Sequence, residues 1–307
     1  MSEAQTRAGF VAIVGAPNAG KSTLVNALVG SKVSIVSPKV QTTRMRVIGI
    51  AMTDLADGGR AQVVLVDTPG IFRIQKRRLE RSMVAAAWRG AEDADVVALV
   101  VDAERGIGQE TKAIVERLKE SKAPRYLVLN KIDLVPREIL LTLTAELNAL
   151  LPFESTFMVS ALKSDGVFDV LKVVAGRLPV SPFLYPEDQA ADLPLRLLAA
   201  EVTREQVFLQ LHQELPYEAA VETEKWEERK DGGVRIEQII YVQREGQRAI
   251  FLGKGGARIK QIGARARHEL SQMLERPVHL FLHVKVSERW AEDPSHYRAI
   301  GLDYEPK

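Results

Sequence analysis

The sequence predicts an α/β domain with a mostly parallel sheet and helices on both faces, followed by a smaller α+β domain. Short β-branched runs alternate with helical patterns from Gly9 to about Leu178, which is typical of parallel sheets. Four prolines then interrupt the pattern between Pro179 and Pro194. After them the order changes to helix, two strands, helix and strand. The predicted boundaries are 1–180 for the first domain, 181–193 for a linker, 194–290 for the second domain and 291–307 for a tail.

The composition is that of a folded protein without cysteine. Of 307 residues, 46% are apolar and 27% charged, which fits two domains of roughly 150 residues each. The lack of cysteine excludes disulfides, thiolate nucleophiles and cysteine-ligated zinc. The N-terminus shows no signal-peptide pattern, and the longest apolar run, Val96–Val101, is far shorter than a membrane span. We therefore expect a cytoplasmic protein, and its net charge of +2 argues neither for nor against nucleic acid.

Continuous apolar runs are the predicted strands of the first domain, because parallel strands are buried on both faces. The runs are Phe10–Val14, Val63–Val66, Val96–Val101, Tyr126–Leu129 and Thr156–Val159. The predicted helices between and after them are Ser22–Val29, Arg77–Gly90, Glu110–Ser121, Arg137–Leu150 and Phe168–Leu178. Ligands of such sheets bind at the carboxyl ends of the strands. The residues that follow each run are therefore the candidate site.

The second domain is predicted from one clear alternation and several helical repeats. From Val278 to Val286, apolar residues alternate with His279, Phe281, His283 and Lys285, which is the period of a half-buried strand. The other predicted elements are a helix at Leu195–Leu211, strands at Ala220–Glu228 and Val234–Arg244, and a helix at Ala257–Leu274. The tail from Trp290 shows no clear pattern.

A glycine-rich loop follows the first predicted strand and opens the first predicted helix. It has the spacing of a phosphate-binding loop, in which backbone N–H groups and a helix N-terminus surround phosphate. Lys21 is expected to reach the β and γ phosphates, and Ser22 to ligate magnesium. An ordinary turn between strand and helix is the alternative. The candidate nucleotide-binding residues here are Gly15, Ala16, Pro17, Asn18, Ala19, Gly20, Lys21, Ser22 and Thr23.

The tetrapeptide Asp67, Thr68, Pro69 and Gly70 directly follows the second run. The Asp67 carboxylate, at a strand end, can hold the magnesium shell, and the Gly70 N–H can bind the γ-phosphate. Taken alone, these residues also fit a type I or type II turn. Beside a phosphate-binding loop, the nucleotide interpretation is favoured.

Two later motifs predict guanine as the base. Asn130, Lys131 and Asp133 follow the run Tyr126–Leu129. The Asp133 carboxylate can accept from N1–H and the 2-amino group of guanine, an edge that adenine lacks, while Asn130 and the Lys131 stem frame the ring. The tripeptide after the last run would offer a backbone N–H to the guanine oxygen. It consists of Ser160, Ala161 and Leu162.

A second glycine-rich loop, Gly253–Gly256, lies between the apolar segment Ala249–Leu252 and the helix predicted after it. In KH domains, a G-x-x-G loop in this context binds the backbone of four nucleotides. A simple helix-entry turn is the alternative. The candidate RNA-binding residues are Gly253, Lys254, Gly255, Gly256, Arg258 and Lys260, and Arg265 and Arg267 continue the positive surface.

Aromatic and histidine side chains of this domain have two interpretations each. Tyr241, Phe251 and Phe281 either stack on bases or belong to the core, and core is favoured for aromatic residues on strands. His279 and His283 share one strand face, but no third metal ligand is evident, so a solvated face is favoured.

Together these motifs, with Gln41-Thr42-Thr43-Arg44, resemble the Era family, the KH-domain members of the translation-factor-related GTPases. The resemblance covers nearly the whole chain. It implies a P-loop GTPase domain, a type II KH domain, and a switch segment at Val33–Gly49 in which Thr43, or alternatively Thr42, completes the magnesium shell. It further implies binding of GTP and GDP with Mg²⁺, and assembly of the small ribosomal subunit through the 3′ end of 16S-type rRNA. A monomer and peripheral association with the inner face of the cell membrane are further expectations.

Hydrolysis of GTP needs catalytic assistance that the residue after Gly70 does not supply in this sequence. The position after Gly70, where Ras-like GTPases keep a water-orienting glutamine, is Ile71. Similar GTPases with asparagine at the place of Asn18 bind potassium there, so we expect K⁺ to supply positive charge at the transition state. The alternative is that Asn18 only hydrogen-bonds the switch backbone. The candidate catalytic residues are Lys21, Asn18, Gly70 and Thr43.

Two other functions compete with that of a GTP-driven RNA-binding switch. In the first, the protein is a membrane or cell-cycle signalling switch whose C-terminal domain docks proteins. In the second, it is a P-loop kinase for a small molecule. The kinase interpretation lacks an evident acceptor pocket and leaves Asn130 and Asp133 unexplained.

Overall fold

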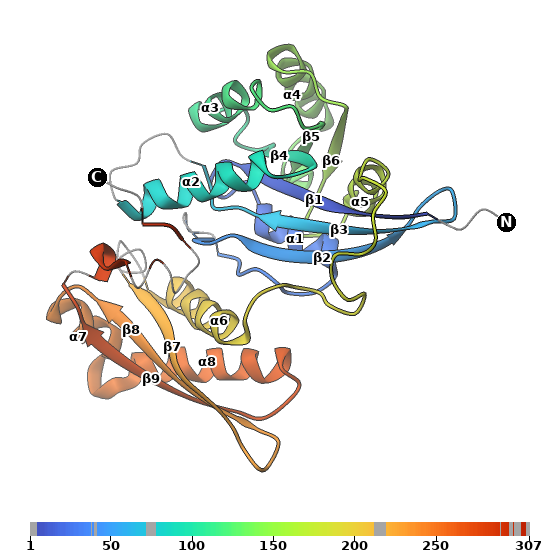
Figure 1. The fold of residues 1–307 in the computed structure, drawn as a ribbon. Coiled ribbons are helices and arrows are strands. Elements are labelled where there is room, and N and C mark those ends of the chain that lie inside the picture. Colours follow the sequence, from blue (N-terminus) through green and yellow to red (C-terminus); the bar gives the residue numbers. More distant parts are fainter. Residues whose placement is uncertain are drawn as a thin grey trace. The chain divides into compact units, whose positions relative to one another are not determined.

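The computed structural model divides into two compact units between Asp192 and Leu193 (Figure 1). The described residues are 5–37, 39, 42–71, 78–211, 219–288, 290–294, 297 and 302–304. Among them, no helix has the length and apolar character needed to cross a membrane.

The first unit is built on a six-stranded sheet with the strand order β2-β3-β1-β4-β5-β6. Five of its strands are parallel and contain the five predicted runs. They are β1 (Thr6–Gly15), β3 (Arg60–Asp67), β4 (Val96–Asp102), β5 (Arg125–Asn130) and β6 (Ser155–Val159). β3, β4 and β5 end on Asp67, Asp102 and Asn130, so polar side chains collect at their carboxyl edge.

The remaining strand, β2 (Val47–Asp54), was not predicted. It pairs with β3 antiparallel and forms one edge of the sheet. The prediction extended the switch segment to Gly49, whereas the chain is already a strand from Val47. The signals were present, since β-branched residues lead to the turn-forming Asp57-Gly58-Gly59.

Helices cover both faces of this sheet, as predicted (Figure 1). Helices α1 and α5 share one apolar core with the strands, and α2, α3 and α4 share another on the opposite face. Their bounds are α1 Lys21–Val29, α2 Arg78–Glu92, α3 Gln109–Leu118, α4 Arg137–Leu150 and α5 Val167–Ala175, with a short 3₁₀ turn at Ile132–Leu134. Arg77, the predicted start of the second helix, lies outside the described residues.

Residues 179–192, here called the edge segment, follow the sheet closely although most of them were predicted as a linker. At one end, Ser181 N–H donates to Thr6 O at 3.1 Å. At the other, Asp192 N–H donates to Ile48 O at 3.1 Å, which places the last residues of the segment along the outer edge of β2. Gln62, fully buried on β3, holds the middle: its Nε2 donates to Tyr185 O at 2.8 Å, and its Oε1 accepts from Leu184 and Tyr185 N–H at 2.8 and 2.9 Å.

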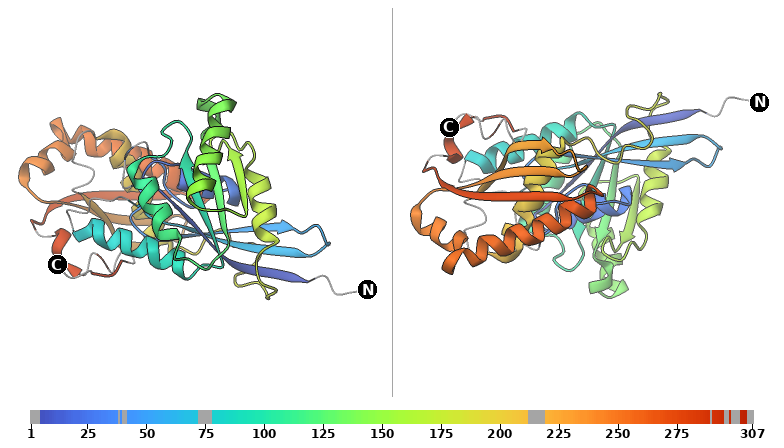
Figure 2. Two further views of the ribbon diagram at one scale, coloured as in Figure 1. Left: turned by 90° about the horizontal axis from the view of Figure 1, so that it is seen from above. Right: turned by 90° about the horizontal axis from the view of Figure 1, so that it is seen from below.

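The second unit is a three-stranded sheet with the order β7-β8-β9. β7 runs antiparallel to β8, and β9 runs parallel to it. Helices α6 and α8 pack on the sheet through two apolar cores (Figure 2). The bounds are α6 Leu195–Gln210, β7 Ala220–Glu228, β8 Val234–Val242, α7 Glu245–Leu252, α8 Ala257–Met273 and β9 Val278–Val286. In β9 the predicted alternation is confirmed, because the histidine, phenylalanine and lysine side chains are all exposed.

Helix α7 was predicted only as a short apolar segment. Its N-terminus is closed by Gln247, whose Oε1 accepts from Gln243 and Arg244 N–H at 2.8 and 3.2 Å. A glutamine at the third helical position is a known start signal that the sequence contained. In the tail, a 3₁₀ turn spans Trp290–Glu292, and Trp290, Tyr297 and Leu302 are buried.

Replacing Gln62 by Ala should loosen the edge segment, because it leaves one carbonyl and two N–H groups, in part-buried hydrogen bonds here, without their partners. The local free energy of opening at the Leu184 and Tyr185 amides should fall by about 2 kcal/mol or more. Hydrogen exchange of these amides measures it. Gln189→Ala, which removes one hydrogen bond within the segment, is the control and should have little effect. Unchanged protection in Gln62→Ala would show that Gln62 does not hold the segment.

Candidate functional site

The phosphate-binding loop is folded against the side chain of Asn130. Gly20, directly before α1, has φ +90°, and a Cβ there would lie 2.2 Å from Asn130 Nδ2. Only glycine satisfies both conditions. The Lys21 ammonium is buried and donates to the backbone oxygens of Gly15 and Ala16 at 3.2 and 3.0 Å. The loop is thus closed on itself around the cation that was predicted to reach the phosphates.

The charge of Lys21 depends on its surroundings. Burial lowers the pKa of Lys21 to about 8, and the nearby Asp67 opposes this shift. A group whose charged form is disfavoured by burial gains most from an anion placed against it. The loop therefore holds a cation that a bound phosphate would stabilise.

Three hydroxyl groups meet the Asp67 carboxylate at the end of β3. Its Oδ2 accepts from Ser22 at 2.7 Å, from Ser34 at 2.6 Å and from Thr43 at 3.4 Å. The hydroxyls of Ser22 and Thr43 are themselves 2.8 Å apart. Of the three residues predicted to ligate magnesium, one comes from α1, one from the switch segment and one from β3, and the fold brings their oxygens together.

The oxygens of this cluster fit a divalent cation. Asp67 is fully buried, and its Oδ1 has no hydrogen-bond partner within the described part of the chain. Burial raises the pKa of Asp67, while its three hydroxyl donors lower it. A hard cation prefers such carboxylate and hydroxyl oxygens, and Mg²⁺ binds with few protein ligands beside phosphate and water.

The two threonines of the switch segment are not equivalent. Thr42 Oγ1 donates to Lys39 O at 2.7 Å, whereas Thr43 Oγ1 faces Ser22 and Asp67. The start of the segment is fixed by Asn26 of α1, whose Oδ1 accepts from Val33 and Ser34 N–H at 2.9 Å each. Gln41 lies outside the described residues. One cleft is lined by Asn18, Lys21, Ser22, Thr42, Thr43 and Gly70 among others.

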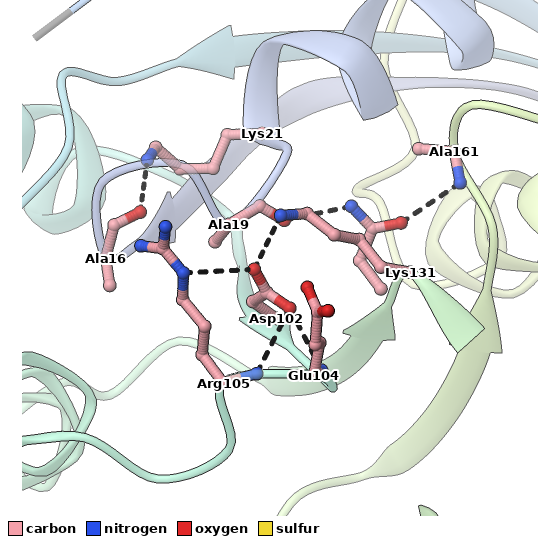
Figure 3. A network of polar contacts seen from close by, with 9 residues as sticks. Ala16, Ala19, Lys21, Asp102, Glu104, Arg105, Lys131 and Ala161 are labelled. Atoms are coloured by element: carbon pink, nitrogen blue, oxygen red, sulfur yellow. Dashed lines mark hydrogen bonds and ion pairs between the residues drawn. The ribbon is translucent and has the colours of Figure 1, made fainter. Parts of the chain in front are cut away.

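The predicted base-binding motifs also meet. Asn130 Nδ2 donates to Ala19 O at 2.9 Å, and Ala161 N–H donates to Asn130 Oδ1 at 3.0 Å (Figure 3). The Ser160 N–H is bonded to Asp165 O at 3.0 Å. Two of the three N–H groups predicted to serve the guanine oxygen are therefore used within the protein.

Asp133 lies just after Lys131 in the 3₁₀ turn that follows β5. The Ser160 hydroxyl, with smaller contributions from Lys163, holds the pKa of Asp133 below its usual range. The carboxylate therefore stays ionised at neutral pH, which is the form that accepts two hydrogen bonds from a guanine edge.

The residues around Gly70 bear on hydrolysis. Gly70 is in close contact with the phosphate loop, since a Cβ there would lie 2.9 Å from Pro17 Cα. Ile71 is buried in the apolar core beneath α2. It offers no polar atom for water, as the sequence indicated. Asn18 has a left-handed backbone with φ +64° at the tip of the phosphate loop.

In the second unit, the G-x-x-G loop joins α7 to α8 through a short 3₁₀ turn at Lys254–Gly256. Gly255 and Gly256 have φ +58° and +78°, and a Cβ on either would meet nothing within 4 Å. The loop is therefore open to a ligand. Lys254 and Lys260 are exposed, but Arg258 is half-buried and donates to Gln210 O at 2.8 Å. That guanidinium supports the end of α6 in this structure.

The aromatic candidates separate clearly. Phe251 is fully buried in the core, whereas Phe281 is 46% exposed, with the Arg235 guanidinium 5.0 Å from its ring centroid. Tyr241 is half-buried. His279 and His283 are exposed, and no group of three or more potential metal-binding side chains occurs among the described residues.

Sequence reasoning missed three residues that organise the nucleotide site. They are Asn26, Ser34 and Asp102. Asp102 could have been found, because it ends β4 as a polar residue at the carboxyl edge of a parallel sheet. Ser34 and Asn26 carry no motif, and their roles depend on how the switch segment folds back over α1.

Comparison with known proteins is consistent with these two sites. The family model described as 50S ribosome-binding GTPase matches residues 10–131, and the KH domain model matches residues 214–291. GTPase Era of Rhizobium meliloti strain 1021 is 60% identical over 97% of this chain and 94% of its own length. GTPase Era of Brucella suis biovar 1 is 56% identical over 98% and 94%.

Two solved structures resemble the whole chain. One is an Era variant of Aquifex aeolicus bound to GDP and AlF₄⁻, with a TM-score of 0.90, 40% identity, and coverage of 96% of this chain and 99% of that one. The other is Era in complex with MgGDPNP and nucleotides 1506–1542 of 16S ribosomal RNA, with the same score, identity and coverage.

The unequal placement of the two threonines leads to a prediction. Thr43→Ala should raise the Mg²⁺ concentration needed for half-maximal GTP hydrolysis by roughly tenfold or more, the scale on which changes around metal ligands act. Thr42→Ala, the matched control, should change it little. A magnesium titration of hydrolysis measures both. A larger effect for Thr42→Ala would exchange the two assignments.

Proposed function

The chain belongs to the Era family of GTPases, and from that premise we propose which residues perform each step and which RNA it binds. As a member of the family it binds GTP and hydrolyses it to GDP and phosphate. One observation carries the assignment of residues. The oxygens of Ser22, Thr43 and Asp67, which come from three separate motifs, converge on one point beside the phosphate-binding loop.

At the phosphate end, backbone N–H groups of residues 15–23 and the Lys21 ammonium would bind the β and γ phosphates. Ser22, Thr43 and Asp67 would hold Mg²⁺, which supplies positive charge to the phosphate oxygens. Thr43 would ligate Mg²⁺ in the GTP state, and Gly70 would bind the γ-phosphate. The contacts of both residues would therefore depend on whether the γ-phosphate is present.

At the base end, we assign guanine specificity to Asp133. Its ionised carboxylate would accept from N1–H and the 2-amino group, and a hydrogen-bonded site of this kind rejects a mismatched edge by roughly 10⁴ or more. Asn130 would act chiefly by joining the loops that carry Ala19 and Ala161. Since the other two N–H groups of that tripeptide are engaged, Leu162 N–H is our choice for the guanine oxygen.

We propose that the second unit binds the single-stranded 3′ end of small-subunit rRNA and so assists assembly of the small ribosomal subunit. The support is the open glycine loop, the exposed Lys254 and Lys260, the KH match and the 16S ribosomal RNA in the Era complex. The signalling alternative has no comparable support. A cytoplasmic location agrees with this role. We keep residues 194–290 as the proposed RNA-binding domain and extend the proposed nucleotide-binding domain from 1–180 to residue 192, because the edge segment is hydrogen-bonded to its sheet.

Replacing both Gly255 and Gly256 by Asp should weaken binding of single-stranded RNA by roughly tenfold or more, because two carboxylates would oppose the phosphates. GTP affinity should not change. Binding of a labelled RNA copied from the 3′ end of 16S-type rRNA measures the effect.

Gly232→Asp is a matched control for this pair, since Gly232 also has positive φ, +79°, and open space around it, but lies in the β7–β8 turn. It introduces one Asp at positive φ elsewhere in the unit, which is half of the strain and charge that the double variant introduces. For the wild type, log affinity should fall with log salt by about 0.7 per phosphate neutralised. If the double variant bound RNA normally, or if Gly232→Asp weakened binding as much, the loop would not be the RNA site.

We further propose that K⁺ assists hydrolysis. Ile71 is buried and apolar, so it cannot orient the attacking water, and positive charge against the phosphates would assist the transition state. Asn18 lines the phosphate cleft, and its side-chain oxygen is the proposed ligand, together with phosphate oxygens.

Hydrolysis should accordingly be several-fold faster in K⁺ than in Na⁺ at equal ionic strength, because the smaller Na⁺ fits the same oxygens poorly. Asn18→Ala should remove this difference. Initial rates of phosphate release in the two salts measure it, in buffers that contribute no further K⁺ or Na⁺ and at constant Mg²⁺. Equal rates for the wild type would indicate that a partner, such as the RNA itself, completes the site.

A further inference from the structure

Asp102 has no part in the motifs described above, yet its carboxylate lies at the base end of the nucleotide site. It is the last residue of β4 and is 5% exposed. Its Oδ2 is 2.5 Å from Lys131 Nζ and 3.7 Å from Arg105 Nε, and its Oδ1 accepts from Glu104 and Arg105 N–H at 3.0 and 3.4 Å (Figure 3). Both oxygens are therefore used: Oδ1 by backbone N–H groups and Oδ2 by side-chain cations.

The two oxygens have separable roles. Oδ1 closes the turn that follows β4, which is a local structural function. Oδ2 faces a different loop, the one after β5, and meets the side chain that the guanine motif provides. The two loops are held side by side by the strand register, in which Asp102 pairs with Asn130, and by Ala103 N–H donating to Asn130 O at 2.9 Å.

The ion pair constrains Lys131 because the Asp102 carboxylate is buried and needs a partner of opposite charge. The Lys131 side chain is 29% exposed, while that of Asp102 is 5% exposed. A buried carboxylate without a partner is costly, so the ammonium is not easily released to solvent. The Lys131 backbone is also in the left-handed region, with φ +65°, a conformation that persists where the surrounding structure holds it. The stem between backbone and ammonium is thus fixed at both ends.

We infer that Asp102 is a positioning residue for the guanine base. By holding the Lys131 ammonium, it orders the methylene stem of Lys131 before the nucleotide binds, and the base then packs against that stem. This inference rests on the proposed guanine site. A side chain that is already ordered costs little on binding, and ordering one long side chain anew weakens binding roughly threefold to tenfold. Asp102 acts through Lys131 and does not touch the nucleotide.

Asp102→Asn tests this role while sparing the turn. The amide oxygen can still accept from Glu104 N–H, but an amide N–H₂ would face the Lys131 ammonium, where donor meets donor. Dissociation constants for GTP and GDP should both rise roughly threefold to tenfold. The KM for GTP should rise with them, while kcat at saturating GTP should stay unchanged, because the base end is remote from the γ-phosphate.

Two further variants complete the experiment. Arg105→Ala removes the other cation near the same carboxylate, but that side chain is 62% exposed, so nucleotide affinity should be unchanged. Lys131→Met keeps the stem and removes the ammonium. In that background Asp102→Asn should weaken nucleotide binding no further, since there is no ammonium left to position. Should Asp102→Asn alone fold poorly, Asp102→Ser in the wild-type and Lys131→Met backgrounds gives the same comparison.

Each result has a distinct meaning. If Asp102→Asn binds GTP as the wild type does, or weakens binding equally in the Lys131→Met background, Asp102 does not act through Lys131 and the inference is wrong. A fall in kcat at saturating GTP would contradict it too. Failure of the guanine site itself would be seen separately, as wild-type binding of ATP within tenfold of GTP.

Discussion

The side-chain amide of Asn130 is the contact on which the nucleotide site depends. It donates to the phosphate loop at Ala19 and accepts from the loop after β6 at Ala161, while its nitrogen occupies the space that a side chain at Gly20 would need. Three loops that are distant in sequence are thereby fixed relative to one another. The phosphate end and the base end of the site can then be complementary to one rigid ligand, because the distance between them is set by the protein.

Two charged side chains of the site are buried beside this framework. Lys21 lies buried at the phosphate loop and Asp67 is buried beneath the hydroxyls of α1 and the switch segment, so each has lost hydration that a ligand of opposite charge can replace. The hydroxyls of Ser22, Ser34 and Thr43 satisfy one oxygen of Asp67 in the meantime. The nucleotide and its metal would therefore enter a site whose charges are already in place and only partly compensated.

Much of this could be read from the sequence, and the exceptions have physical causes. The five parallel strands are continuous apolar runs, and the motifs at their ends converge because parallel strands finish at one edge. β2 begins with an apolar run, residues 47–52, but it was missed because the switch segment implied by the family resemblance was extended through Gly49, over the start of the strand. Arg258 was assigned to the RNA surface from charge alone, and only the fold shows its guanidinium turned toward Gln210 O. The edge segment was taken for a linker because its hydrogen bonds use backbone groups, which leave no signal in side-chain patterns.

The edge segment also sets where the nucleotide-binding unit ends. A fragment cut at residue 180 would lose the hydrogen bonds that Ala190 and Asp192 make with Ile50 and Ile48. The outer backbone of β2 would then be open to other strands. Such a fragment would tend to self-associate through this edge. One that continues through Asp192 keeps the edge covered and Gln62 fully bonded. For work on the isolated unit, the boundary suggested by proline content is therefore too early, and the boundary given by backbone hydrogen bonds is the one to use.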